Sequence, residues 1–170
     1  MAMRRVLKMQ RLQWIVLVGC LLLTSRCKAE AICPWLNAAT AAGMVNGPVT
    51  LEMNSTGDGG NICIFRSQRG SAVYSLEISV REMKDESKGI ASYQSRCTSP
   101  ATSLRAIGNE AVSCSVDAGS SHGERVIGRV RNSIFIVDIR DSVAKDPSMT
   151  RDLLQERASS TAEQVAGNLF

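Results

Sequence analysis

The sequence predicts an α+β domain in which an antiparallel sheet of about six strands packs against three helices. Three observations predict this class. Residues 72–80 alternate between apolar side chains (72, 74, 76, 78 and 80) and a second set that is polar except for Val73, as in a strand with one buried face. Apolar residues recur at helical spacing from 149 to 169. The predicted elements then run helix, three strands, helix, three strands, helix, and strands grouped between helices are typical of α+β domains.

The first half of the predicted domain begins with a short helix within residues 34–46, which are rich in alanine. Asn37 is a suitable N-cap and Gly47 a suitable stop signal. Turn-forming residues then separate three predicted strands, at 49–53, 62–67 and 72–80.

The second half begins with a polar helix over 84–96, followed by strands at 111–116, 124–131 and 133–140. A two-residue turn at Asn132-Ser133 would pair Val130 with Phe135 and give the hairpin one continuous apolar face. The last helix is expected to start at Asp146, an N-cap residue followed by proline.

The N-terminal segment has the pattern of an export signal. Basic residues without acids precede WIVLVGCLLL, an apolar run too short to span a membrane. Cleavage after Ala31, in the small-x-small pattern of residues 29–31, uses the whole run and makes 1–31 a signal peptide and 32–170 a single domain. Residues 17–20 also resemble a lipobox, in which Cys20 would be acylated and would anchor the protein in the membrane. An uncleaved membrane anchor is the remaining alternative.

The basic character of the chain belongs to this segment. The whole chain has 20 Lys/Arg and 16 Asp/Glu, and residues 1–31 hold six of the former and one of the latter, which leaves a net charge of −1 for the rest. Binding of nucleic acid through a general positive field is therefore not expected. The predicted location is periplasmic or extracellular, or lipid-anchored if Cys20 is acylated.

Four cysteines remain after cleavage at Ala31, and an even set is typical of proteins in oxidising compartments. Three pairings are open, and closeness in sequence favours Cys33 with Cys63 and Cys97 with Cys114. No CxxC motif and no His or Cys pair at ligand spacing is present, so the sequence predicts neither a metal site nor a cofactor.

Two short motifs resemble those of a known group of proteins. Residues 33–37 (CPWLN) and 46–49 (NGPV) are similar to a C-x-L-L-T…L-G-x-P-V opening, and residues 107–111 (IGNEA) resemble a later step into a strand. The group consists of small exported bacterial proteins, best known from actinobacteria, some secreted and some lipoproteins, of unknown function. The resemblance implies a PsbP-like α/β sandwich and no catalytic residues. The chain departs from the motif at 43–47, where GMVNG replaces a Leu-Gly pair.

Candidate functional residues are few. His122, in GSSHGE, could act as a base only with neighbours such as Ser121 and Glu124, and is expected to be a solvated loop residue. Arginines interleaved with isoleucines near the hairpin are typical of an interface. With Arg81 noted as a further candidate, the predicted partner-binding residues are Arg125, Arg129, Arg131, Ile134, Ile136 and Arg140.

Two purely structural interpretations of these residues are also open. The arginines could pair with nearby acids on a solvated face, or the isoleucines could lie beneath a helix. The sequence favours an exported, non-catalytic domain that binds a protein partner or small ligand in the cell envelope. A small secreted hydrolase with an unrecognised site and an inhibitor of secreted enzymes are the alternatives.

Overall fold

The computed structural model describes residues 31–57, 59–83, 89–143 and 146–170, and the account below concerns these residues. The predictions for the signal peptide, including Cys20 and Cys27, lie outside them. The described residues from Ala31 to Phe170 belong to one compact unit.

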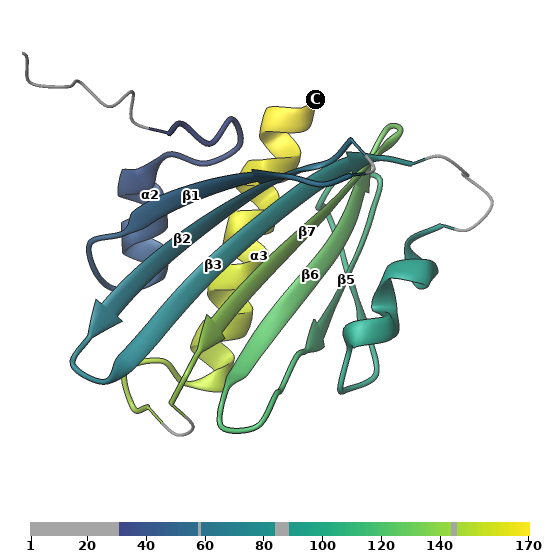
Figure 1. Cartoon of the computed structure of the whole chain (residues 1–170). Coiled ribbons are helices and arrows are strands. Elements are labelled where there is room, and N and C mark those ends of the chain that lie inside the picture. The colour runs from purple at the N-terminus through teal and green to yellow at the C-terminus, as the bar shows by residue number, and fades with distance from the viewer. Residues whose placement is uncertain (1–30, 58, 84–88, 144–145) are drawn as a thin grey trace, which may run out of the picture. The chain divides into compact units, whose positions relative to one another are not determined.

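The described chain contains a single seven-stranded sheet in which all neighbouring strands are antiparallel, in the order β1-β2-β3-β7-β6-β5-β4 (Figure 1). The α+β class is confirmed, and the predicted count of about six strands is one short. The additional strand, β4, pairs only with β5 at the sheet edge. The strands are β1 (Thr50–Ser55), β2 (Asn61–Arg69), β3 (Ala72–Glu82), β4 (Thr102–Leu104), β5 (Glu110–Ser115), β6 (His122–Val130) and β7 (Ser133–Asp141).

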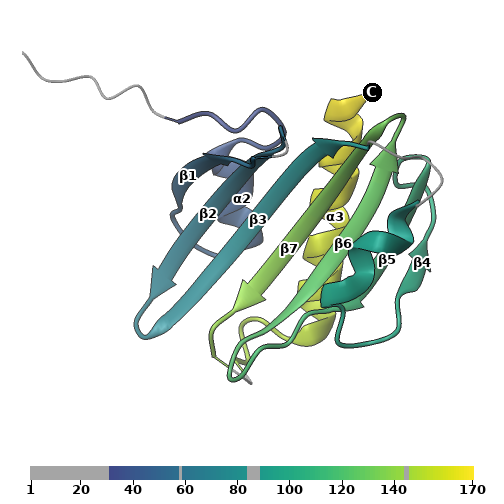
Figure 2. The ribbon, with the colours of Figure 1, turned by 45° about the vertical axis from the view of Figure 1, so that its right-hand side comes forward.

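Helices cover the sheet unequally on its two faces (Figure 2). The α-helices α2 (Ala38–Met44) and α3 (Arg151–Leu169) share the main hydrophobic core with one face of the sheet, which we call the core face. The 3₁₀ helix η2 (Ile90–Arg96) packs on β6 from the other side, which we call the open face. None of the described helices is long and apolar enough to cross a membrane.

The two α-helices begin at capping residues, of which the sequence identified one correctly. Asn37 caps α2 by accepting a hydrogen bond from the Thr40 amide at 2.8 Å. The prediction that Asp146 caps α3 is wrong: Thr150 is the N-cap, and Asp146 instead accepts a hydrogen bond from the Tyr74 hydroxyl of β3. This bond lowers the pKa of Asp146 and raises the pKa of Tyr74.

The β6–β7 hairpin has the predicted faces and a different register. Val130 pairs with Ser133, and Gly128 lies opposite Phe135, so the two-residue turn is Arg131-Asn132. Arg131 takes a positive φ of 52° and its amide donates to the Asn109 side chain at 2.6 Å. The shift of two residues preserves which side chains face the core, because strand side chains alternate with period two.

The two disulfides join Cys33 to Cys63 and Cys97 to Cys114, which confirms the pairing favoured by sequence locality. The first ties the segment before α2 to β2 within the main core. The second ties the end of η2 to β5. It thereby fixes η2 against the open face of the sheet.

Candidate functional site

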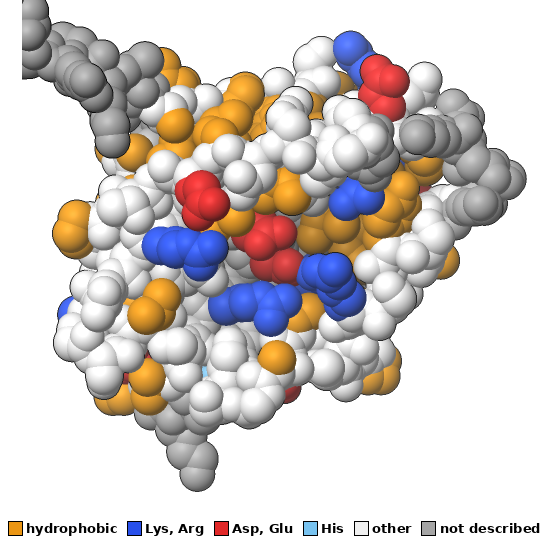
Figure 3. Space-filling view, in the orientation of Figure 1, with side chains coloured by type: hydrophobic (Ala, Val, Ile, Leu, Met, Phe, Trp, Pro, Cys, Tyr) orange, Lys and Arg blue, Asp and Glu red, His pale blue; other side chains and the backbone are white. Residues whose placement is uncertain are grey.

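A groove of about 350 Å³ lies between η2 and the open face of the sheet. Figure 3 shows basic and acidic side chains gathered at the centre of this face, beside hydrophobic surface. We call it the η2 groove. Its lining consists of Thr56, Ile62, Glu77, Ser79, Arg81, Ser92, Tyr93, Ser95, Arg96, Arg125, Ile136 and Asp138.

Two long-range links hold the η2 wall of this groove in place. Ile90, which is buried, packs on Ile127 and Ile134 of the hairpin. At the other end of η2, Cys97 is bonded to Cys114. The wall is therefore fixed at both ends although it is a short 3₁₀ helix, which alone would be a weak element.

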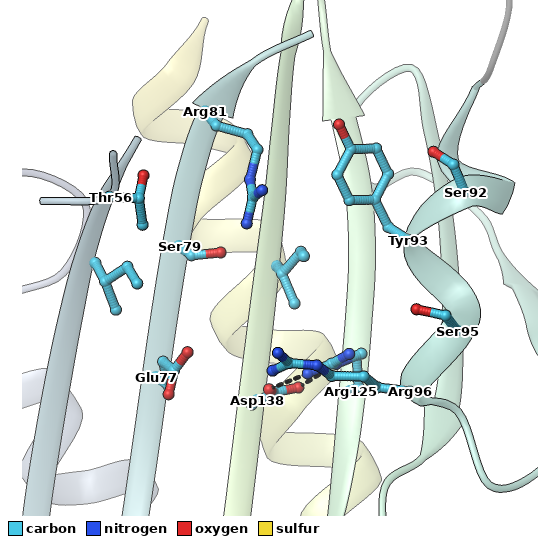
Figure 4. Close-up of a pocket in the computed structure, with 12 residues that line it drawn as sticks. Thr56, Glu77, Ser79, Arg81, Ser92, Tyr93, Ser95, Arg96, Arg125 and Asp138 are labelled. Atoms are coloured by element: carbon cyan, nitrogen blue, oxygen red, sulfur yellow. Dashed lines mark hydrogen bonds and ion pairs between the residues drawn. The ribbon is translucent and has the colours of Figure 1, made fainter. Parts of the chain in front are cut away.

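A buried ion pair forms one end of the groove. Arg125 of β6 and Asp138 of β7 are cross-strand partners with side chains only 4% and 7% exposed. Arg125 donates from Nε to Oδ1 at 2.6 Å and from Nη2 to Oδ2 at 2.5 Å (Figure 4). This two-bond geometry is the strong form of an arginine–carboxylate contact and raises the pKa of Arg125. Arg140 adds a longer contact, from its Nη2 to Asp138 Oδ2 at 3.6 Å.

Glu77 lies next to this pair on β3, as the cross-strand partner of Asp138. Burial raises the pKa of Glu77, and the neighbouring Asp138 carboxylate raises it further. Arg140, Arg125 and Arg96 act in the opposite direction without cancelling the increase. Glu77 is thus a partly buried acid of the groove lining whose proton is held more tightly than usual.

The other end of the groove is built around an aromatic ring. The Arg81 guanidinium lies 5.6 Å from the centroid of the Tyr93 ring, within range of a cation–π interaction. Figure 4 shows Arg81 and Tyr93 at the end opposite Glu77 and Asp138, and Ser79 between them. The half-buried Ile136 contributes apolar lining.

The predicted partner-binding residues are only partly brought together. Ile136 and Arg125 line the groove, with Arg140 close to Asp138, but Arg125 is buried in its ion pair and is not the exposed contact expected. Ile134 is fully buried beneath η2, which agrees with the structural interpretation that the isoleucines lie beneath a helix. The other two predicted residues lie outside the groove lining.

Those two residues are held by other contacts. Arg129 approaches Glu110, with Nε 3.7 Å from Oε2. Arg131 is in the hairpin turn, and its guanidinium lies 6.0 Å from the centre of the Phe170 ring. Sequence reasoning grouped them with Arg125 through their alternation along β6, which continues correctly to Arg129 and ends at the turn.

His122 is also placed differently from the prediction. It is the half-buried first residue of β6 and the cross-strand partner of the buried Asp141, not a solvated loop residue. Its Nδ1 is enclosed and makes no hydrogen bond within the described residues. The nitrogen therefore shows no contact with a serine nucleophile of the kind a hydrolase needs.

The sequence did not single out Arg96, Tyr93 or Glu77 as site residues. Nothing in the local sequence of the predicted helix over 84–96 indicates that it lies over the arginine-bearing face. The Cys97–Cys114 pairing was the available signal, because Cys114 shares a face with Arg125, its cross-strand partner.

Comparison with known proteins identifies no relative of this chain. No protein-family model matches the chain, and no curated protein and no solved structure shows significant similarity to it. Within the ranges that the structure describes, no three His, Cys, Asp or Glu side chains gather as a metal site would require. The functional interpretation therefore depends on the geometry of the η2 groove.

Proposed function

We propose that this protein is an exported, non-catalytic domain that binds a ligand or a segment of a protein partner through the η2 groove. The observation that carries the proposal is the convergence of arginine, aromatic and hydroxyl side chains in one concave site with a fixed wall. Small-molecule sites typically combine an apolar lining with a few polar groups that set orientation. The two disulfides and the signal-like N-terminus support a location in an oxidising compartment.

The charged groups at the groove support binding more than catalysis. A carboxylate that acts as a base must be able to accept a proton from the substrate. Asp138 is engaged by two arginines, and its two short bonds with Arg125 hold both carboxylate oxygens in place. Such a pair suits a site that holds its shape while a ligand enters and leaves.

A substitution that fills the groove tests this proposal. Ser95 is an exposed residue of η2 that lines the groove, and Ala91 is exposed on the same helix outside the lining. Immobilised wild-type protein, Ser95→Trp and Ala91→Trp are each incubated with cell-envelope extract, and the retained small molecules and proteins are identified by mass spectrometry. We expect at least one component retained by the wild type and Ala91→Trp and lost with Ser95→Trp. Identical retention by all three would refute the proposal.

A further inference from the structure

We propose that the η2 groove binds an uncharged sugar unit of a carbohydrate, which its side chains hold through hydrogen bonds to the ring hydroxyls. This inference rests on the proposed function and specifies the class of ligand for the same groove. Three features of the groove carry it: free donors and acceptors that occur together, accessible charges of opposite sign, and a floor made of central strands.

Ser79 is a buried residue whose hydroxyl is available to a ligand. It lies on β3 with only 7% of its surface exposed, and it lines the groove. Its hydroxyl makes no hydrogen bond within the described part of the chain. Figure 4 shows it pointing across the groove toward Ser95 of η2. A hydroxyl in this position can both donate to a ligand and accept from it.

Three further side chains of the lining can also bond to a ligand. Ser95 and Arg96 are exposed on η2, and neither makes a hydrogen bond within the described ranges. Glu77 makes none with the described residues either, so its carboxylate oxygens are acceptors beside these donors. Because each hydroxyl of a sugar ring both donates and accepts, one ring can bond to the serines, to Arg96 and to Glu77 together.

The other polar side chains of the lining are already engaged and are not counted as free. Arg125 and Asp138 bind each other through their two short hydrogen bonds. Ser92 donates to a backbone carbonyl oxygen at 3.3 Å. Thr56 and Arg81 also have partners. The groups left for a ligand are therefore a small set in which donors and acceptors are both present.

The charges at one end of the groove favour a ligand without net charge. Figure 4 places Glu77 and Asp138 at the same end as Arg96 and Arg125. An anionic group at this end would meet two carboxylates, and a cationic group would meet two guanidinium groups. Like charges brought together in this way are unfavourable. An uncharged hydroxyl avoids both costs, and it can donate to Glu77 or accept from Arg96.

The floor of the groove favours a sugar over a peptide. It is formed mainly by β3 and β7, which pair with each other and, on their outer sides, with β2 and β6. Their backbone N–H and C=O groups are therefore used within the sheet, whereas an extended peptide adds to an exposed sheet edge. A helical peptide needs a hydrophobic groove, and here only Ile62, Ile136 and the Tyr93 ring are apolar.

Recognition in the η2 groove is thus left to side chains. Its volume of about 350 Å³ is near the lower limit for small-molecule sites. Only a small part of a carbohydrate can therefore enter, and the rest of a longer chain would extend into solvent.

Uncharged probes test this inference by NMR titration of the exported protein. The sugars are maltose, cellobiose, lactose and diacetylchitobiose, and the peptide is acetyl-Ala-Ala-Ala-amide, which also carries donors and acceptors without charge. We expect at least one disaccharide to bind, with amide shift changes centred on Glu77, Ser79 and Ser95. The peptide should bind more weakly than that disaccharide, and equal or tighter binding of the peptide in the groove would overturn the inference.

Two variants show whether the hydrogen bonds of the groove hold the sugar. Ser79→Ala should weaken the disaccharide about threefold or more, as the loss of one hydrogen bond to a ligand should. Glu77→Gln should also weaken it about threefold or more, because a charged acceptor forms the stronger bond. Ser67→Ala is the matched control, since Ser67 is a buried serine of β2 outside the lining and should leave the affinity unchanged.

The result can separate this inference from the proposed function. Unchanged affinity in both Ser79→Ala and Glu77→Gln would refute binding through these groups. If no disaccharide perturbs groove residues, the inference is likewise refuted, and the envelope-extract experiment separately decides whether the groove binds another ligand.

Discussion

Replacing Arg125 with alanine should be among the most destabilising single changes in the domain. The substitution leaves Asp138 buried at the base of the η2 groove without its two short hydrogen bonds. A carboxylate left unpaired in such a place cannot regain its lost hydration, which is why breaking one partner of a buried pair costs about 3–5 kcal/mol.

The structure sets the expected cost near the lower end of that range. Arg140 is 29% exposed and stays within 3.6 Å of Asp138, so the carboxylate keeps one cationic neighbour after Arg125 is removed. We therefore expect a loss of about 3 kcal/mol in the free energy of unfolding. Typical domains have about 5–15 kcal/mol in total, so the loss should be easily measured.

Urea denaturation followed by circular dichroism, with the disulfides intact, measures this loss. Arg66→Ala is the control, because the Arg66–Glu52 pair has side chains 51% and 57% exposed and should contribute less than about 1 kcal/mol. The double variant Arg125→Met, Asp138→Leu should recover at least about 2 kcal/mol relative to Arg125→Ala, since no buried charge is left unpaired. A loss below about 1 kcal/mol for Arg125→Ala would show that the pair is not a buried, mutually dependent unit.

Further changes test the core and the wall of the groove. Gly128→Ala should lower the free energy of unfolding by about 1–3 kcal/mol in urea denaturation, because the added methyl would overlap the Phe135 ring; no change would show that the ring can move aside. Gly43→Ala, in open space on α2, should instead stabilise by about 0.5–1 kcal/mol, and a loss would contradict that placement. Replacing Cys97 and Cys114 by serine should lower the free energy of unfolding by about 3 kcal/mol, as expected for a loop of 17 residues; a loss below about 1 kcal/mol would mean that the disulfide contributes little to holding the η2 wall.

The sequence predicted those parts of the fold that depend on local patterns. The alternation in 72–80 identified β3, and the apolar period identified α3, because each pattern reflects one buried face. The cap at Asn37 is also local, since its acceptor and the Thr40 amide are three residues apart. These features are determined by residues that are close together in the sequence.

The parts that were missed depend on contacts between distant residues. Asp146 has the chemistry of an N-cap but is drawn to Tyr74, 72 residues away. The hairpin turn falls at Arg131 because Asn109 accepts a hydrogen bond from its amide across 22 residues. β4 is only three residues long and exists through its pairing with β5. The secondary-structure propensity of a local segment does not indicate which distant residues it will contact.

Only part of the candidate site was predicted, because the rest of it also depends on contacts between residues that are distant in the sequence. Alternation along β6 and β7 placed Arg125, Ile136 and Arg140 on one face, which the register confirms. It did not indicate that η2 would close over this face and bring Tyr93 and Arg96 to it. The burial of Arg125 follows from that cover and from the direct pairing with Asp138 across the hairpin.

The most direct test of the groove as the binding site is an amide NMR titration of the wild-type domain with a component that it retains from envelope extract, repeated on Ser95→Trp. We predict chemical-shift changes centred on Glu77, Asp138 and Tyr93, and their loss when tryptophan fills the groove. Changes centred on α3 and the core face, or changes that persist unaltered in Ser95→Trp, would contradict the assignment of the η2 groove as the binding site.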